Sequence, residues 1–320
     1  MQNKVVVLGT GGTIAGSATS AQDGVGYVAG ALSVAELLQA LPGLDAAGIE
    51  AESLCRIDSK DMSHAVWRAL AQRVAAHLER PEVAGMVVTH GTDTLEETAY
   101  FLHRVLGPAK PVVLTAAMRP ASALSADGPQ NLFDAITIAR MGGVNGARGV
   151  VAVLAGTVHG AAALRKQNSY RVDAFDSGDA GPLARLEEGR LRSFRPWPDE
   201  PGIGLASIEP DAAGWPAVDV VASHAGVRAA AVDGLVAAGA QGLVVAGTGN
   251  GTIHVALEAA LRRAEAAGVT VWRSTRCAYG AVVGAPDGAF SAAGSLGPWQ
   301  ARIELMLRLL QKRAGPARGA

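Results

Sequence analysis

Two stretches of the chain place hydroxyl groups among glycines directly after short apolar runs. The first is VVVLGTGGTIAG at 5–16, which contains Thr13, and the second is VVTHGTDTLEETAY at 87–100, where Thr92 precedes an acidic segment opening at Asp93. Short runs rich in β-branched residues that end in glycine are typical of buried parallel strands. Polar residues at the carboxyl ends of such strands lie where open α/β sheets bind ligands. The two turns therefore form a candidate active site.

The chemistry that such turns would support is nucleophilic attack by a threonine hydroxyl, which needs a neighbouring base at neutral pH. Tyr27, on the glycine-rich segment after the first run, and Lys166, in RKQNSYR, are the candidate bases. A lysine beside Asp93 is expected to stay charged. From spacing alone, turn stabilisation by Thr13 is favoured over nucleophilic attack. For His90, packing at a strand end and proton transfer both stay open.

Two nucleotide-binding motifs are incomplete in the glycine-rich turn. A dinucleotide fingerprint that starts at Gly9 and Gly11 needs a third glycine where the chain has Ile14. A P-loop needs lysine after Gly16, where the chain has Ser17. Nucleotide binding is therefore disfavoured, and the chain also lacks the Gly-x-Ser-x-Gly elbow of serine hydrolases.

Composition favours a small-molecule partner and no metal. The chain has 320 residues, 49% of them hydrophobic, and its 28 basic residues nearly balance 29 acidic ones. No run of lysine or arginine forms a stripe, so nothing favours a nucleic-acid or anionic membrane surface. The only cysteines are Cys55 and Cys277, without a CxxC pair, which argues against a disulfide framework and a zinc site.

The first residues predict a soluble, cytoplasmic protein. MQNKVVVLGTGG contains one lysine and a short apolar run. That run is far below the about 20 apolar residues of a membrane span. A chain from which a leader had been removed would begin in the same way, so a periplasmic location with a removed signal peptide is the alternative.

Apolar runs and amphipathic stretches alternate along the chain, which indicates a parallel sheet with helices on its faces. Strands are expected at 5–8, 86–89, 111–117, 149–156, 218–223, 242–249 and 269–275, and helices at 33–41, 63–80, 93–106, 131–140, 226–239, 254–267 and 298–311. The stretch RIDSKDM at 56–62 is expected to be irregular or extended. The predicted fold class is α/β, with a Rossmann-like, parallel-sheet amino-terminal domain at 1–192, a linker at 193–216, and a smaller α/β carboxy-terminal domain at 217–320.

Along essentially its whole length, the chain resembles the bacterial L-asparaginase family, also known as asparaginase/glutaminase. GTGGTIAG at 9–16 looks like the first active-site signature of the family, and THGTDTLEETAY at 89–100 looks like the second. Supporting pieces are DSKDM at 58–62, AMRPASALSADGPQNL at 117–132, RKQN at 165–168 and AGTGNG at 246–251. Two long motifs in order, with matching pieces between them, form a specific signal and favour Thr13 as a nucleophile.

The resemblance implies hydrolysis of the asparagine side-chain amide to aspartate and ammonia, through an acyl-enzyme-type intermediate and without a cofactor. Thr13 matches the nucleophile of the family, and Tyr27 matches the tyrosine that helps to accept its proton. Thr92, Asp93 and Lys166 match a second cluster that activates water or supports the nucleophile. Which threonine attacks first stays open.

Substrate binding is also implied by position. The matching positions are Gly12, Ser59, Thr92, Asp93, Ala117 and Asn250. Among them, Ser59 and Asp93 match residues that hold the α-carboxylate and α-amine of the substrate, and Ala117 matches a position near the leaving amide. The resemblance further implies a homotetramer, a dimer of dimers in which the carboxy-terminal domain of one copy completes the site of its neighbour.

The chain departs from the family pattern at three places. Lys60 follows Ser59 where well-known members have glutamine, and a lysine there is expected to turn away from a substrate ammonium. Asp287 is the only acid in CAYGAVVGAPDGAF, and it is not assigned as the acid that a neighbouring subunit supplies. Thr252 stands where relatives carry asparagine or serine.

Other functions are weighed against an L-asparaginase. A mixed glutaminase-asparaginase that also takes L-glutamine is the first alternative. The amidase subunit of a tRNA-dependent amidotransferase is less favoured, because a near-neutral chain of 320 residues leaves little room for a basic, tRNA-facing domain. A silent binding protein is disfavoured by the joint presence of the five matched catalytic residues.

Overall fold

The chain divides into two compact units, Met1–Leu205 and Ala206–Ala320. The computed structural model describes residues 4–18, 20, 26–142, 146–209, 211–284 and 288–314. In these ranges, no helix is both long and apolar enough to span a bilayer. The predicted linker bounds, 193–216, stay a prediction.

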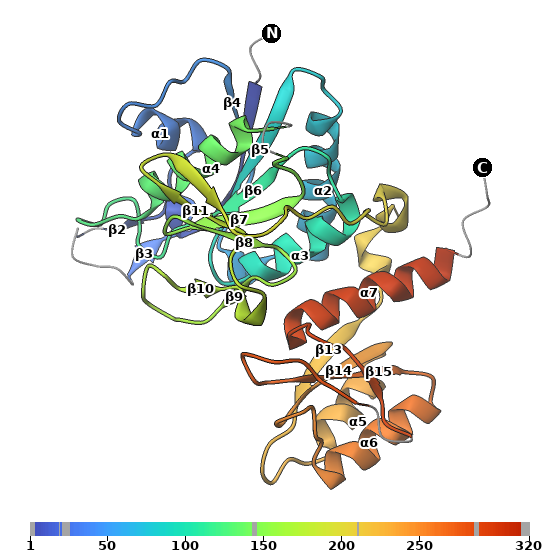
Figure 1. Ribbon diagram of the computed structural model, residues 1–320. Coiled ribbons are helices and arrows are strands. Elements are labelled where there is room, and N and C mark those ends of the chain that lie inside the picture. Colours follow the sequence, from blue (N-terminus) through green and yellow to red (C-terminus); the bar gives the residue numbers. More distant parts are fainter. Residues whose placement is uncertain are drawn as a thin grey trace. The chain divides into compact units, whose positions relative to one another are not determined.

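An eight-stranded sheet forms the core of the first unit, in the order β12-β11-β8-β7-β6-β5-β1-β4 (Figure 1). The strands are β1 (Lys4–Gly11), β4 (Ile49–Ile57), β5 (Val83–Thr89), β6 (Val112–Thr115), β7 (Val150–Leu154), β8 (Thr157–Gly160), β11 (Ala184–Glu187) and β12 (Arg190–Ser193). The five strands from β4 to β7 in this order pair in parallel, and the last three pair antiparallel. β1 and β5 are buried along their apolar runs, which confirms the predicted parallel core.

Helices cover both faces of this sheet (Figure 1). They are α1 (Val34–Gln39), α2 (His64–Leu78), α3 (Leu95–Leu106) and α4 (Gly128–Arg140). Ser33 and Ser63, the first residues of the helices expected at 33–41 and 63–80, both cap their helix by accepting a backbone N–H of its first turn, and Ser33 forms a full capping box with Glu36. α1 and α4 pack on the sheet face that carries Val5, Val87 and Val113, while α2 and α3 contact each other and the strands.

Short elements follow the strand ends of the first unit. They are the two-stranded pairs β2 (Ser17–Ala18) with β3 (Tyr27–Val28) and β9 (Arg165–Lys166) with β10 (Phe175–Asp176), and the 3-10 helices η1 (Thr13–Ala15), η2 (Ser59–Asp61) and η3 (Gly178–Ala180). The stretch expected as one strand at 149–156 ends earlier, because Ala155 (φ 47°) and Gly156 (φ 69°) turn the chain back into β8. The hairpin β11–β12 was not predicted at all.

The second unit is a smaller sheet with helices on both sides (Figure 1). Its strand order is β13-β14-β15-β16, with the pairs all parallel. Its elements are β13 (Val218–Ala222), β14 (Gly242–Gly247), β15 (Thr270–Thr275), β16 (Ser291–Ala292), α5 (Ala230–Ala237), α6 (Val255–Ala266) and α7 (Pro298–Ala314), with η4 (Leu205–Ile208) and η5 (Ala212–Gly214) before the first strand. The predicted α/β class therefore holds for both units.

Candidate active site

Thr13 and Tyr27 form the first hydroxyl pair of the site. β1 ends in glycines, and the chain then turns into η1, which carries Thr13. Tyr27 lies on β3, which pairs with β2 directly after η1, opposite Ala18. This pairing brings Tyr27 Oη to 2.5 Å from Thr13 Oγ1. The Thr13 side chain is nearly buried, with 6% of the residue exposed.

Glycines bring three segments into close contact beside this pair. Gly12 has φ 82°, and a Cβ atom there would lie 2.4 Å from the Gly91 nitrogen. A Cβ atom on Gly91 would in turn lie 2.4 Å from Ser59 Oγ. Such distances leave no room for a side chain at either glycine. The turns after β1 and β5 therefore meet through bare backbone, and the backbone of Gly91 packs against the Ser59 side chain at the start of η2.

Thr92, Asp93 and Lys166 form the second cluster. Lys166 Nζ donates to Thr92 Oγ1 at 3.0 Å and to Asp93 Oδ1 at 2.6 Å. Thr92 and Asp93 lie just before α3, whereas Lys166 comes from β9. The Lys166 side chain is 19% exposed and that of Asp93 is 54% exposed. A cation is thus held between a hydroxyl and a carboxylate that faces solvent.

Ser59 joins η2 to this second cluster. Its hydroxyl accepts the Asp93 backbone N–H at 3.2 Å, and its carbonyl accepts the Thr94 hydroxyl at 2.7 Å. The neighbouring Lys60 forms an ion pair with Asp61. Lys60 Nζ is therefore engaged within η2, as expected for a side chain that turns away from the site.

Ala117 is fully buried after β6, and its loop is held by two residues that the sequence analysis did not single out. Asp127 accepts the backbone N–H groups of Met118 and Arg119 at 3.0 and 2.9 Å. Asn131 donates to the Ala116 carbonyl at 2.9 Å. Both lie in the ADGPQN run that opens α4, where an Asp followed by Gly-Pro is the available sequence signal for a turn.

The sequence left two roles open for His90, packing at a strand end and proton transfer, and the structure favours packing. Its Nδ1 donates to the Gly91 carbonyl at 2.7 Å, so Nε2 accepts the Thr98 hydroxyl at 3.0 Å. The Thr98 oxygen also accepts Trp67 Nε1–H at 2.9 Å. Complete burial lowers the pKa of His90 to about 4, so the ring is neutral at pH 7, and it is not exposed to solvent.

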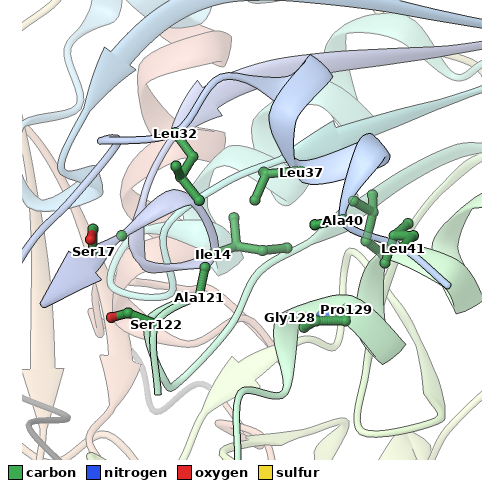
Figure 2. Close-up of a pocket in the computed structure, with 12 residues that line it drawn as sticks. Ile14, Ser17, Leu32, Leu37, Ala40, Leu41, Ala121, Ser122, Gly128 and Pro129 are labelled. Carbon is green, nitrogen blue, oxygen red and sulfur yellow. The ribbon is translucent and has the colours of Figure 1, made fainter. Parts of the chain in front are cut away.

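A hollow of about 230 Å³ lies behind the first hydroxyl pair. Figure 2 shows Ile14, next to Thr13, reaching toward Leu37 of α1, with Gly128 and Pro129 of α4 on another side. Its lining is almost wholly apolar, with Ser17 and Ser122 at one end (Figure 2). Ile14, the residue after Thr13, therefore lines a mostly apolar hollow.

The remaining candidates lie elsewhere or outside the described residues. Asn250 belongs to the second unit, where its amide group donates to the Val283 carbonyl at 2.7 Å and accepts the Val283 N–H at 2.8 Å. Thr252 forms a turn with Thr248. Asp287 lies outside the described residues. Within the described ranges, no three His, Cys, Asp or Glu side chains gather as a metal ion would require.

Fold and site together define a two-unit α/β protein in which two hydroxyl-centred clusters follow the ends of neighbouring parallel strands. Family comparison gives the same organisation: the description "Asparaginase, N-terminal" matches residues 4–198, and "Glutaminase/Asparaginase C-terminal domain" matches residues 217–317. The chain belongs to the asparaginase family, which confirms the resemblance seen in its motifs.

Relatives cover nearly the whole chain. L-asparaginase 2 of Escherichia coli (strain K12) is 36% identical over 320 residues, spanning 97% of this chain and 89% of the relative. The glutaminase-asparaginase of Pseudomonas fluorescens biotype A is 33% identical, spanning 95% of this chain and 86% of the relative. Among solved structures, a probable cytoplasmic L-asparaginase from Campylobacter jejuni is 34% identical, with a TM-score of 0.89 over 96% of this chain and 95% of that one.

Proposed function

We propose that the protein is an L-asparaginase, which hydrolyses L-asparagine to L-aspartate and ammonia. The observation that carries the proposal is the pair of clusters, Thr13 with Tyr27 and Thr92 with Asp93 and Lys166, joined by the Gly12–Gly91 contact. Membership of the asparaginase family and the relatives named L-asparaginase support the same substrate.

Thr13 is the proposed nucleophile. Its Oγ1 attacks the amide carbon, and the hydroxyl proton is relayed by way of Tyr27 Oη, 2.5 Å away, to the amide nitrogen, which leaves as ammonia. Backbone N–H groups near Thr13 and Thr92 stabilise the developing oxyanion, a contribution on the order of 3 kcal/mol per donor. Ammonia leaves toward Ala117, and water then releases aspartate from the threonine ester.

The second cluster serves two proposed roles. Lys166 Nζ and Thr92 Oγ1 orient the attacking groups, because the 3.0 Å bond fixes the hydroxyl between β5 and β9. Asp93 and Ser59 hold the α-amine and α-carboxylate of the substrate, since an exposed carboxylate pairs with an ammonium and a hydroxyl at a helix start receives an anion. Asn250 of a neighbouring copy contacts the substrate in a homotetramer located in the cytoplasm.

Ammonia release from L-asparagine tests the proposal, with L-glutamine compared at equal concentration. We expect Thr13→Ala and Thr92→Val each to lose at least about 10³-fold in turnover. Thr137→Val is the matched control, because Thr137 Oγ1 bonds only to the Phe133 carbonyl within α4. Absence of ammonia release from either amide by the unaltered chain would refute the proposal.

Glutaminase activity is a second candidate, because relatives named glutaminase-asparaginase are 33% and 34% identical to this chain. One methylene group separates the two substrates, and a pocket distinguishes such a difference by about 1 to 3 kcal/mol. The ratio of ammonia released from the two amides in the same experiment therefore decides between them.

A further inference from the structure

Lys166 lies on one of the shortest strands of the fold. β9 consists of Arg165 and Lys166 and pairs with β10 alone. Gln167 donates its N–H to the Ala174 carbonyl at 2.7 Å, and the Lys166 N–H, one residue earlier, points away from β10. Backbone pairing therefore supports this residue from one side only.

Glu96 supports the other side. Its Oε2 accepts the Lys166 backbone N–H at 2.7 Å, although the two residues lie 70 positions apart in the chain. Glu96 is in the first turn of α3 and is only 8% exposed. A backbone N–H group that is shielded from solvent needs an acceptor, so this part-buried contact constrains where β9 lies.

Residues at the start of α3 thus bind both the side chain and the main chain of Lys166. Thr92 and Asp93, just before α3, bind its Nζ, and Glu96, in the first turn of α3, binds its main chain. A lysine side chain has four flexible methylene groups, and fixing its main chain limits the positions that the ammonium can reach.

The charges around Glu96 are mixed. Arg165 and Lys166 on β9 lower its pKa and Glu97 on α3 raises it, but burial dominates and raises the pKa to about 7. The carboxyl group titrates near neutral pH as a result, which makes the contact observable.

We propose that Glu96 is a positioning residue of the site, which holds Lys166 Nζ between Thr92 Oγ1 and Asp93 Oδ1 by accepting the Lys166 backbone N–H. The proposal rests on the proposed function for its effect on turnover. Glu96 itself does not touch substrate: it acts through Lys166.

Two substitutions of Glu96 distinguish the effect of its hydrogen-bond acceptor from the effect of its negative charge. Glu96→Leu removes the acceptor, and we expect kcat for asparagine to fall about 10²-fold with a much smaller change in KM, because a displaced group costs about that much. Glu96→Gln keeps a carbonyl oxygen at the same place, and we expect it to recover most of the kcat that leucine loses. Asp134→Leu is the matched control, since Asp134 is also a buried helical carboxylate but bonds to Gln130 within α4.

An amide NMR titration tests the contact without any assay of activity. In the unaltered protein, the Lys166 amide proton should shift as pH passes through about 7, where Glu96 titrates. The shift should be absent in Glu96→Gln. A Lys166 amide proton that does not respond to pH, or a Glu96→Leu variant with unchanged kcat, would overturn the proposal. A protein that releases no ammonia would refute the proposed function instead, while the amide titration would still report on the contact.

Discussion

The two threonines of the site lie beside elements that differ in length and in packing. Thr13 lies on a 3-10 helix of three residues between glycines, and its hydroxyl meets Tyr27 from a two-residue strand. Thr92 comes directly before a twelve-residue helix and bonds to Lys166, whose main chain is anchored by Glu96. Unfilled space of about 230 Å³ backs the first region, whereas Trp67 stacks on Phe101 of α3 in the second, with ring centroids 5.0 Å apart.

This difference indicates that the two regions have different roles within one site. Elements with few packed contacts open at a lower free energy than buried helices and strands. The short strand β3, which carries Tyr27 and the exposed Val28, can therefore rearrange around a substrate. The buried η1 residues and the Thr92 region stay fixed, and in the proposed function they position the substrate. Proteins commonly combine a rigid scaffold with a lightly supported functional loop in this way.

The largest effect that tests this comparison is expected for Lys166. Lys166→Met removes a charged donor that two groups share, and we expect turnover of asparagine to fall about 10³-fold. Tyr27→Phe removes one hydroxyl from the lightly supported region, and we expect a fall of about 10²-fold. Steady-state ammonia release measures both.

Lys110→Met controls for the loss of a partly buried lysine, because Lys110 Nζ bonds to the Leu78 and Arg80 carbonyls away from the site. It should leave turnover unchanged. If Tyr27→Phe proved as damaging as Lys166→Met, the two regions would share the chemistry equally and the proposed division would fail.

Much of the fold and of the two site clusters could be predicted from the sequence. The buried runs of β1 and β5 and the caps Ser33 and Ser63 have strong local signals, because apolar runs and capping residues act over a few positions. The five residues proposed as catalytic came from motif resemblance, and the structure brings them into two clusters. Composition and spacing alone favoured a turn role for Thr13.

The missed elements have weaker signals or depend on distant residues. β4 alternates apolar and charged residues instead of forming an apolar run, because it is an edge strand whose Glu50 and Glu52 pair with arginines of α2 and the following turn. The hairpin β11–β12 turns through Glu188 and Gly189, both with positive φ, and Glu-Gly is a weaker turn signal than Asn-Gly. Glu96 lies in the first turn of α3, where an acid is favoured, but its contact with Lys166 crosses 70 positions and has no local signal.

Glu96 should also shape the pH dependence of stability. Its pKa is 4.5 when unfolded and about 7 when folded, so the folded state binds the extra proton between these values. The contribution of Glu96 to stability is therefore complete below about pH 4.5 and is lost as pH rises toward 7. His90 and His159 act in the opposite direction, because their folded pKa values of about 4 lie below 6.5 and their contribution is lost as pH falls.

Glu96→Gln removes only the first of these opposing contributions. We compare the melting temperature of Glu96→Gln with that of the unaltered protein at each pH. The difference in favour of the variant should increase by a few degrees between pH 5 and pH 7 and then level off, since 1 kcal/mol corresponds to about 2 to 4 °C in a large domain. Calorimetry across that range measures the difference. A constant difference at all pH values would show that the carboxyl group does not titrate there.

The smallest expected effect concerns the hollow behind Thr13 (Figure 2). Ile14 and Ile138 of α4 are both buried in the same core cluster, but only Ile14 also lines this space. Atoms that face unfilled space have fewer neighbours to lose, so removing one methylene from Ile14 should cost less than the same change at Ile138. We expect Ile14→Val to cost about 0.5 kcal/mol and Ile138→Val about 1.5 kcal/mol, the two ends of the usual range. Urea unfolding of the two variants measures the difference. Equal costs would mean that the hollow is filled in solution, and the light support of the nucleophile region would then have to come from its short elements alone.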